Sequence, residues 1–235
     1  MKRNPLKIII TTDSNLFIGG APSTFEIGGI DQCTVLDNEG KPYIPASSFK
    51  GAFRAMIKDM ITIQDNSNKY IVQIYEDYFK TEEEKITLLH RMDDKVKLDK
   101  ALQQFLNTKE RISLEYLFGI EGVNRSPKLI FSDFHVMNHS LQSEQCFSID
   151  SKNSITEDKE KSTVSSNPRT YKSVIKGITF AGEIDFYNFS NEQSLKIVRD
   201  FVKSSLTKFN EGIYRIGNSK SRGYGKIIID FQDQG

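Results

Sequence analysis

The order of apolar segments along the chain predicts an α+β protein with a ferredoxin-like (RRM-like) βαββαβ core. Some segments repeat apolar residues at every second position, as strands do, and others repeat them at the spacing of a helix face. The two kinds follow one another in the order strand, helix, strand, strand, helix, strand. In residue numbers these elements are 5–12, 47–60, 128–137, 174–187, 191–209 and 224–231.

The first element is a strand, followed by a turn and an irregular region. Alternating apolar residues predict a mostly buried strand at residues 5–12. The next turn contains Gly19 and Gly20, and residues 21–44 are predicted to form an irregular loop and hairpin. Within that region Asp37 lies in the sequence Asp-Asn-Glu-Gly, which favours a hairpin turn over a catalytic acid.

The first helix, at 47–60, begins with residues that suit a helix start. Pro45 precedes Ser47 and Ser48, and either serine could cap the free backbone N–H groups. Basic side chains recur along it at Lys50, Arg54 and Lys58. A helix N-terminus carries a partial positive charge, so with cations beside it this is a candidate phosphate site. The alternative is an ordinary amphipathic helix with a solvated charged face.

Two long insertions interrupt the core pattern. Residues 61–116 are charged and carry apolar residues at helical intervals, which predicts a helical insertion, a lid beside the main sheet. Residues 138–172 are polar and hold too few apolar residues for a core, so composition alone predicts a mobile, exposed loop. No repeats and no Pro/Gly linkers divide the chain, and residues 1–235 are therefore predicted to form one elaborated domain.

The last loop, residues 212–226, is rich in glycine and interleaves arginine, lysine and tyrosine. Glycine lets a backbone approach a ligand closely, and basic and aromatic side chains suit a phosphodiester chain with stackable bases. Many such loops are only turns, so this loop alone is weak evidence for a site. Together with the basic helix start it indicates nucleic-acid binding.

Composition and charge restrict the classes of function and the cellular location that the chain can have. The chain has 32 basic and 31 acidic residues, for a net charge of +1, so overall charge does not indicate nucleic-acid binding. Cys33 and Cys146 lie far apart without metal-ligand spacing, and free thiols are expected. The three histidines show no metal or triad spacing. Without a signal peptide or an apolar run of membrane length, the expected location is the cytoplasm, with no membrane partner.

Several motifs, in order, resemble the RAMP superfamily of CRISPR proteins, and the match is best to the repeated backbone subunit of Csm-like type III effector complexes. The main motifs are Ile27-Gly-Gly-Ile-Asp31, Ile44-Pro-Ala-Ser-Ser-Phe-Lys-Gly-Ala-Phe-Arg54 and Ser219-Lys-Ser-Arg-Gly-Tyr-Gly225. Shorter matches lie between them at Leu117–Gly119, Lys128–Asp133 and Asn167–Thr170. The resemblance therefore covers nearly the whole chain.

The resemblance implies a subunit that binds guide RNA and cleaves complementary target RNA at regular intervals, in antiviral defence. It also implies the partners, which are guide RNA, target RNA, further copies of the chain in a helical filament and other type III effector subunits. Heterologous contacts between identical subunits build such open assemblies. In the family, the segment matching 138–172 is a thumb-like protruding β-hairpin that presses between guide and target strands.

The resemblance also implies site residues. It makes Asp31 the catalytic residue, where a carboxylate could orient the attacking 2′-hydroxyl, take its proton or help hold a divalent cation such as Mg²⁺. The alternative is that Asp31 merely caps a turn. The expected RNA contacts are Gly19, Gly20, Ser48, Lys50, Arg54, Arg169, Tyr171, Lys220, Ser221, Arg222 and Gly223. No residue set with metal-ligand spacing is predicted.

Three other functions stay open. This sequence has Phe17 where the family usually has a histidine, which favours a scaffold that binds guide RNA without cleaving. A guide-precursor-processing RAMP endoribonuclease would use histidine, or tyrosine and lysine, yet no histidine lies near the glycine-rich segments. A general single-strand RNA-binding protein outside CRISPR is the third, and the combined motifs disfavour it.

Overall fold

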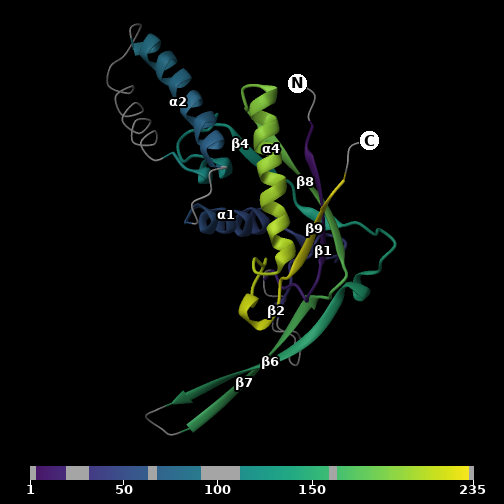
Figure 1. The fold of residues 1–235 in the computed structure, drawn as a ribbon. Coiled ribbons are helices and arrows are strands. Elements are labelled where there is room, and N and C mark those ends of the chain that lie inside the picture. Colours follow the sequence, from purple (N-terminus) through teal and green to yellow (C-terminus); the bar gives the residue numbers. More distant parts are fainter. Residues whose placement is uncertain (1–3, 20–31, 63–67, 91–111, 159–162, 233–235) are drawn as a thin grey trace. The chain divides into compact units, whose positions relative to one another are not determined.

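The computed structural model describes residues 4–19, 32–62, 68–90, 112–158 and 163–232 (Figure 1). Helices and antiparallel strands are both present, which confirms the predicted α+β class. The strands are β1 (Leu6–Thr12), β2 (Gln32–Cys33), β3 (Tyr43–Ile44), β4 (Lys128–Phe131), β5 (Phe134–Val136), β6 (Phe147–Asp158), β7 (Thr163–Val174), β8 (Thr179–Tyr187) and β9 (Ile227–Phe231). The α-helices are α1 (Ala46–Thr62), α2 (Asn68–His90) and α4 (Glu192–Leu206).

Short 3₁₀ turns and two compact units complete the description. The turns are η1 (Leu114–Phe118), η2 (Ser143–Cys146), η3 (Thr207–Glu211) and η4 (Lys220–Arg222). The unit called here the helical unit comprises Met1–Pro5, Phe53–Ile130 and Ile184–Ser205. The sheet unit comprises Leu6–Ala52, Phe131–Glu183 and Leu206–Gly235. Whether they fold as one domain stays a prediction. None of the helices in the described segments is long and apolar enough to cross a membrane.

The strands form two sheets. The larger sheet has the order β3-β5-β8-β1-β9, and β4 also pairs with β8. β1 pairs antiparallel with β9, from Ile8 opposite Phe231 to Thr12 opposite Ile227. The smaller sheet has the order β2-β7-β6. Figure 1 shows β6 and β7 as a long two-stranded ribbon that extends away from β1 and β9.

The core of the sheet unit is aromatic. Phe49, near the start of α1, is fully buried, and its ring centroid lies 4.7 Å from that of Phe134 on β5. Phe209 packs on the same side chain with a centroid distance of 6.1 Å. Gly182 on β8 leaves room for Phe134, because a Cβ there would lie 2.5 Å from the ring. Apolar burial of this kind supplies most of the stability of a fold.

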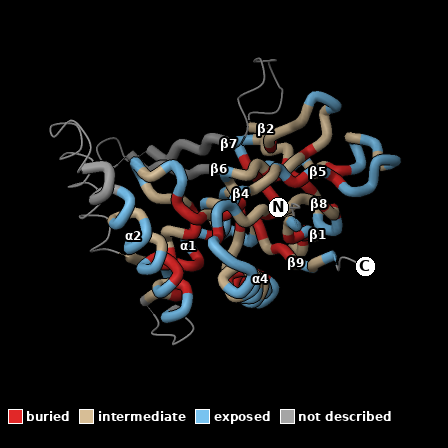
Figure 2. Tube along the Cα trace, turned by 90° about the horizontal axis from the view of Figure 1, so that it is seen from above, coloured by how far each residue is buried: buried red, intermediate tan, exposed pale blue. Residues whose placement is uncertain are grey.

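The helical unit has an aromatic core of its own. Tyr75 on α2 is buried, and its hydroxyl donates a hydrogen bond to the Pro127 carbonyl oxygen at 3.0 Å. Its ring meets Tyr116 edge-on at 5.6 Å, and Phe53 meets Phe118 in the same way at 5.3 Å. The tube in Figure 2 shows buried stretches along α1 and exposed stretches along α2 and α4.

Three sequence predictions differ from the structure in detail. The strand predicted at 174–187 is β8 and begins at Thr179, because Val174 ends β7. The segment predicted as one strand at 128–137 forms two strands, β4 and β5. Ser132 and Asp133 separate them, and their side chains form hydrogen bonds with other segments. The Ser132 hydroxyl accepts the Glu183 N–H at 2.8 Å, and Asp133 Oδ1 accepts the Ala46 N–H at 2.7 Å. The start of α1 is therefore capped by Asp133, a residue far away in the sequence, where Ser47 or Ser48 was expected.

The polar stretch 138–172 contains paired strands, as the β-hairpin implied by the resemblance requires, where composition alone predicts a loop. Within it, β6 and β7 pair antiparallel in one unbroken register, from Phe147 opposite Val174 to Asp158 opposite Thr163. A backbone ladder pairs the N–H and C=O groups that face the other strand, and the groups on the outer edges remain open to water. Composition carries no information on this pairing, because it does not record which residues face each other across the two strands.

Candidate nucleic-acid interface

The glycine loop, residues 212–226, presents an exposed basic turn. Lys220, Ser221 and Arg222 form the 3₁₀ turn η4, and all three residues are exposed. Left-handed backbone brackets the turn on both sides, with φ of 58° at Ser219 and 92° at Gly223. The Arg222 N–H donates to the Ser219 carbonyl oxygen at 2.9 Å. Two cations and exposed backbone are therefore held together on one tight turn.

Two other glycines of the loop allow close backbone approach. Gly225 has φ of 80°, and a Cβ on it would lie 1.9 Å from the carbonyl oxygen of Ile216. The Ile216 N–H donates to the Gly225 oxygen at 3.0 Å, so these two backbones pack directly on each other. Gly217 has φ of 75°, and its Cβ would lie 2.4 Å from the Phe17 oxygen. At these positions glycine is required by conformation and by space.

Arg215 braces the loop from within. Its Nη1 donates to the Lys220 carbonyl oxygen at 3.0 Å, and its Nε donates to the Gly212 oxygen at 3.2 Å. The guanidinium group thereby connects the start of the loop to the basic turn. Arg215 is basic, but in this structure its guanidinium group supports the loop by binding two of the loop's own carbonyl oxygens.

Residues 13–19 join the glycine loop to the base of the β6–β7 hairpin. Leu16 exchanges two backbone hydrogen bonds of 2.8 Å with Val174, and the Asn15 carbonyl accepts the Gly225 N–H at 2.8 Å. The Asn218 N–H donates to the Phe17 oxygen at 2.7 Å. One short segment therefore bonds both the hairpin and the loop through its backbone.

An ionic contact strengthens the same junction. The two carboxylate oxygens of Asp13 bind Lys176 at 2.8 Å and Lys226 at 2.7 Å. The hydrogen bond from Lys176, followed by that from Lys226, lowers the pKa of Asp13 to about 2. Asp13 is therefore ionised at neutral pH, and its single negative charge is shared between the two lysines.

Phe17 and Tyr171 pack together beside this junction. Phe17 is 3% exposed, and its ring meets that of Tyr171 edge-on at 5.3 Å. Tyr171, on β7, is half-buried, so part of its surface is used for packing. Arg169, two residues earlier, is exposed. Gly19 is exposed as well and forms an isolated antiparallel β-bridge with Thr34. A Cβ added at Gly19 would lie 3.4 Å from the Asn218 side chain.

The start of α1 is a weaker anion site than its sequence predicts. Asp133 already places a carboxylate on the Ala46 N–H, and the Ser48 N–H donates to the Pro45 oxygen at 3.0 Å. A negative charge at a helix N-terminus offsets the attraction that a phosphate would feel. Ser48 and Lys50 are both intermediate in exposure.

Arg54 belongs to the helical unit and has an acidic partner there. Its Nε and Nη2 both lie 2.9 Å from Oε2 of Glu115, on η1. Arg54 is therefore not an unpaired cation, and an RNA phosphate would have to compete with Glu115. The other predicted contacts in the described segments belong to the sheet unit, namely Gly19, Ser48, Lys50, Arg169, Tyr171, Lys220, Ser221, Arg222 and Gly223.

Asp31 and Gly20 lie outside the described residues. The next two residues, Gln32 and Cys33, form β2, which pairs in parallel with Tyr171 and Lys172 of β7. Within the described segments there is no group of three or more His, Cys, Asp or Glu side chains that could hold a metal ion. Cys33 and Cys146 are free thiols, as expected, and burial raises the pKa of both.

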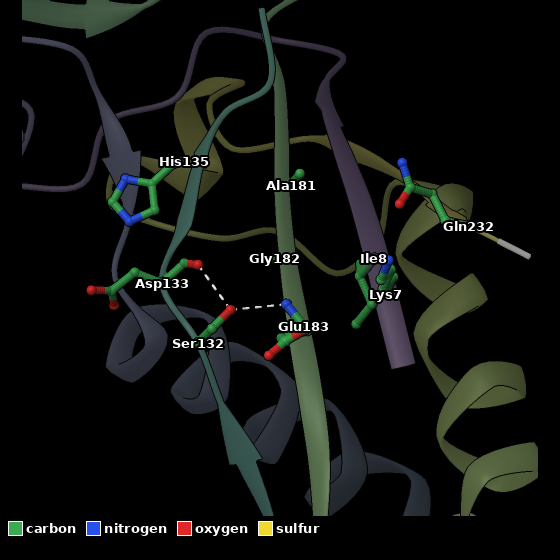
Figure 3. Close-up of a pocket in the computed structure, with 9 residues that line it drawn as sticks. All are labelled: Lys7, Ile8, Ser132, Asp133, His135, Ala181, Gly182, Glu183 and Gln232. Carbon is green, nitrogen blue, oxygen red and sulfur yellow. Dashed lines mark hydrogen bonds between the residues drawn. The ribbon is translucent and has the colours of Figure 1, made fainter. Parts of the chain in front are cut away.

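An open pocket of about 520 Å³ lies on the larger sheet (Figure 3). Its charged lining combines Lys7 with Asp133 and Glu183, and His135 lies at its edge. This mixture of charges does not favour a polyanion. The His135 ring also stacks on Tyr43 with a centroid distance of 5.7 Å, which gives it a packing role.

Sequence reasoning missed the hydrogen bonds that link Asn15, Asp150 and Tyr224 beside the glycine loop. The Tyr224 hydroxyl donates to Asp150 Oδ2 at 2.5 Å, and the Asn15 side chain donates to the same oxygen at 3.3 Å. Tyr224 lies inside the Ser219–Gly225 motif, so its position was visible in the sequence. Asp150 had no local signal, because its partners lie in other segments.

Comparison with known proteins gives three findings. The family model described as RAMP superfamily matches residues 9–228. The CRISPR system Cms endoribonuclease Csm3 of Methanocaldococcus jannaschii is 28% identical over 226 residues, covering 94% of this chain and 76% of the relative. A chain in the cryo-EM structure of the type III-B Cmr-beta bound to cognate target RNA has a TM-score of 0.53 at 18% identity. That alignment covers 99% of this chain but only 60% of the solved one.

Proposed function

Because the chain belongs to the RAMP superfamily, with 220 consecutive positions from residue 9 to residue 228 inside the match, we propose that it is a guide-RNA-binding backbone subunit of a type III CRISPR ribonucleoprotein. In this proposal the assembled complex is an RNA-guided endoribonuclease that cleaves complementary target RNA at regular intervals, in antiviral defence. The similarity to a Csm3 endoribonuclease along 94% of the chain supports it.

The observation that carries RNA binding is the exposed basic turn of the glycine loop. Lys220 and Arg222 stand on a backbone that Gly217 and Gly225 fix against neighbouring segments. Cations held on a rigid turn bind a phosphodiester chain with little loss of conformational entropy. Ser221 and Gly223 add a hydroxyl and exposed backbone at the same place.

The core of the subunit is proposed to be ferredoxin-like. The neighbour order β5-β8-β1-β9 supports this, because a βαββαβ core places its first strand beside its third and fourth. β1, β8 and β9 would be the first, third and fourth core strands, with β5 as the second. α1 and α4 follow β1 and β8 in the chain, as the two core helices should.

Asp31 is the proposed catalytic residue, on the strength of the family motif. Its carboxylate would orient the 2′-hydroxyl of the target RNA or accept its proton as the hydroxyl attacks the adjacent phosphate. Mg²⁺ often uses only one or two protein carboxylates, completed by water and phosphate. A single aspartate therefore fits such an ion once RNA is bound, and the ion would stabilise charge at the phosphate.

Metal removal tests this part of the proposal. Addition of EDTA to the guide-loaded complex should stop target cleavage and leave target binding unchanged, because the ion is needed only beside the scissile phosphate. Mg²⁺ in excess over the chelator should restore cleavage. Binding is followed by gel shift and cleavage by the length of a labelled target. Undiminished cutting in EDTA would contradict the requirement for a divalent cation.

The remaining partners follow from the same proposal. Further copies of the chain would line one guide RNA in a helical filament, and other type III subunits would cap it. A filament of identical subunits needs two different contact surfaces on each copy. The cytoplasm is the proposed location, because guide and target RNA would meet there.

Two alternatives have specific observations behind them. A scaffold without cleavage is favoured by Phe17, which is buried and packed and so supplies neither an acid nor a base. A guide-precursor-processing enzyme would need a titrating side chain at the RNA. The ring of His135 stacks on Tyr43, so this histidine has a packing role away from the glycine loop.

Guided cleavage in a reconstituted complex decides among these functions. A labelled RNA complementary to the guide should be cut at regularly spaced positions, and an RNA of unrelated sequence should stay intact. Binding of the complementary RNA without cutting identifies the scaffold. Cutting of the guide precursor by the isolated subunit identifies the processing enzyme.

The basic turn makes a separate prediction about salt dependence. Replacing Lys220 and Arg222 by alanine should weaken guide RNA binding for every sequence and reduce the slope of log K against log salt by about 0.7 for each lost phosphate contact. Fluorescence anisotropy at several salt concentrations measures this slope. Lys80→Ala, which removes an exposed lysine of α2, is the control and should leave the slope unchanged. Equal slopes in all variants would exclude the turn from the interface.

A further inference from the structure

The carboxylate of Asp150 joins three segments that are distant in the sequence. Asp150 lies on β6, directly opposite Tyr171 of β7. Its Oδ2 accepts hydrogen bonds from the Tyr224 hydroxyl at 2.5 Å and from the Asn15 side chain at 3.3 Å. Tyr224 belongs to the glycine loop, and Asn15 belongs to the segment between the loop and the hairpin. Strand, loop and connecting segment therefore meet at one oxygen atom.

Two serines of the hairpin complete the network. Ser173 Oγ donates to Oδ2 at 2.9 Å, and Ser148 Oγ donates to Oδ1 at 2.9 Å. Both lie on the same face of the hairpin as Asp150, because strand side chains alternate between faces. These serines tie Asp150 to its own hairpin, whereas Tyr224 and Asn15 tie the hairpin to the rest of the interface.

The carboxylate remains ionised although it is partly buried. Burial disfavours the charge, but hydrogen bonds from Tyr224, Ser173, Ser148 and Asn15 outweigh it and lower the pKa of Asp150. Burial, followed by the bond to Asp150, raises the pKa of Tyr224 to about 12. At neutral pH the pair is therefore a phenol donating to a carboxylate, and such charge-assisted bonds are short and strong. Asp150 takes part in none of the ion pairs found among the described residues.

The bond lies where the hairpin leaves its support. The backbone contacts to the hairpin are made at its base, where β2 pairs with Tyr171 and Lys172 and Leu16 pairs with Val174. Beyond Asp150 the register of β6 and β7 continues for eight more pairs, to Asp158 opposite Thr163. A two-stranded ribbon is only marginally stable by itself, so the side-chain bonds at its base restrict how it can swing.

We propose that Asp150 is a positioning residue that, through Tyr224, locks the direction of the β6–β7 hairpin to the glycine loop. This inference rests on the proposed function, in which the loop binds the guide RNA and the hairpin presses between guide and target strands. A fixed angle between the two determines which target phosphate is presented for cleavage. Asp150 itself touches no reacting atom in this arrangement.

Two conservative substitutions isolate the bond. Tyr224→Phe removes one hydroxyl and keeps the ring, and Asp150→Asn keeps the shape and removes the charge. Each should slow single-turnover target cleavage roughly ten- to a hundredfold, because a small misplacement of reacting groups is costly. Guide RNA affinity should stay within about twofold of the wild type, because the basic turn is unchanged. The double variant should be no slower than the slower single variant, because Tyr224→Phe removes the bond and Asp150→Asn removes the charge that strengthens the same bond.

Hydrogen exchange supplies a readout that does not depend on cleavage. Backbone amides of the paired residues 152–158 and 163–169 should exchange roughly tenfold faster in both variants, while the amides of β1 and β9 should not change. Ser148→Ala is the matched control, because it removes a bond to the same carboxylate within the hairpin and leaves Tyr224 attached. It should behave like the wild type in both assays. A thermal melt of each variant checks that the fold is intact.

The outcomes separate this inference from the proposed function. Slow cleavage, intact guide binding and faster hairpin exchange in both variants support the positioning role. Wild-type exchange in Tyr224→Phe overturns it, and so do additive effects in the double variant or a Ser148→Ala variant as slow as Tyr224→Phe. If the wild-type complex never cuts a complementary target, the nuclease proposal fails, and the exchange data still decide whether the bond holds the hairpin.

Discussion

Replacement of Gly225 by alanine should destabilise the protein by about 4 kcal/mol or more and abolish guide RNA binding. The new Cβ would lie 1.9 Å from the Ile216 carbonyl oxygen, a distance that forces one of two bonded backbone segments to move. The φ of 80° adds conformational strain of about 1–2 kcal/mol for a residue with a side chain. Because the same residue bonds the Asn15 carbonyl, movement would spread to the hairpin junction.

Urea unfolding measures the loss of stability, and anisotropy with labelled guide RNA measures binding. The melting temperature should fall by roughly 8–16 °C, given the usual entropy of unfolding for a chain of this size. Gly177→Ala is the matched control, because Gly177 has φ of 91° but no atom within 4 Å of its Cβ position. It should lose only the conformational part, about 1–2 kcal/mol. Equal losses in the two variants would show that the close approach at Gly225 costs nothing.

The regular elements were predictable because their signal is local. Alternation identified β1 and β9, and helical spacing identified α1 and α4, each within a few residues of the observed ends. The need for glycine in the last loop was also readable, since glycine beside basic residues indicates close backbone approach. Gly217 and Gly225 fulfil this expectation with positive φ and crowded Cβ positions.

Contacts between distant segments were not predictable from local pattern. Asp133 caps α1 from 87 positions away, and Asp150 meets Tyr224 from 74 positions away. Periodicity identifies the face of an element that a residue occupies, but it does not identify the partner opposite that face. Arg54 shows the consequence, because its place in a basic stripe suggested a phosphate contact while the structure pairs it with Glu115.

Composition predicted a loop where the polar β6–β7 hairpin lies, for a related reason. Disorder is expected where a segment cannot bury enough apolar surface to offset its loss of conformational entropy. β6 and β7 instead use a backbone ladder, and the hydrogen bonds of Asp150 with Tyr224 and Asn15 secure its base. A polar segment can therefore be ordered by hydrogen bonds that its composition does not reveal.

Substitution of Asp31 by alanine should reduce target cleavage by about 10²- to 10⁴-fold in the guide-loaded complex, the range expected for loss of a group that assists proton transfer. Guide and target binding should not change, because one carboxylate contributes no attraction to a polyanion. Asp31→Asn should be nearly as slow, since an amide keeps the shape but cannot take a proton. Single-turnover cleavage with Mg²⁺ present, alongside gel shift for both RNAs, measures the two effects separately.

Asp37→Asn is the control for the same region of the chain. Asp37 Oδ1 accepts the N–H groups of Glu39 and Lys41, both at 2.9 Å, in the turn that the sequence predicted, and an asparagine oxygen can accept them as well. This variant should therefore cut at the wild-type rate. If Asp31→Ala also cuts at the wild-type rate, Asp31 is a turn residue and the chemistry belongs to another group. Slow cutting by Asp31→Ala with unchanged binding assigns the chemistry to its carboxylate, because the remaining contacts to both RNA strands are then intact.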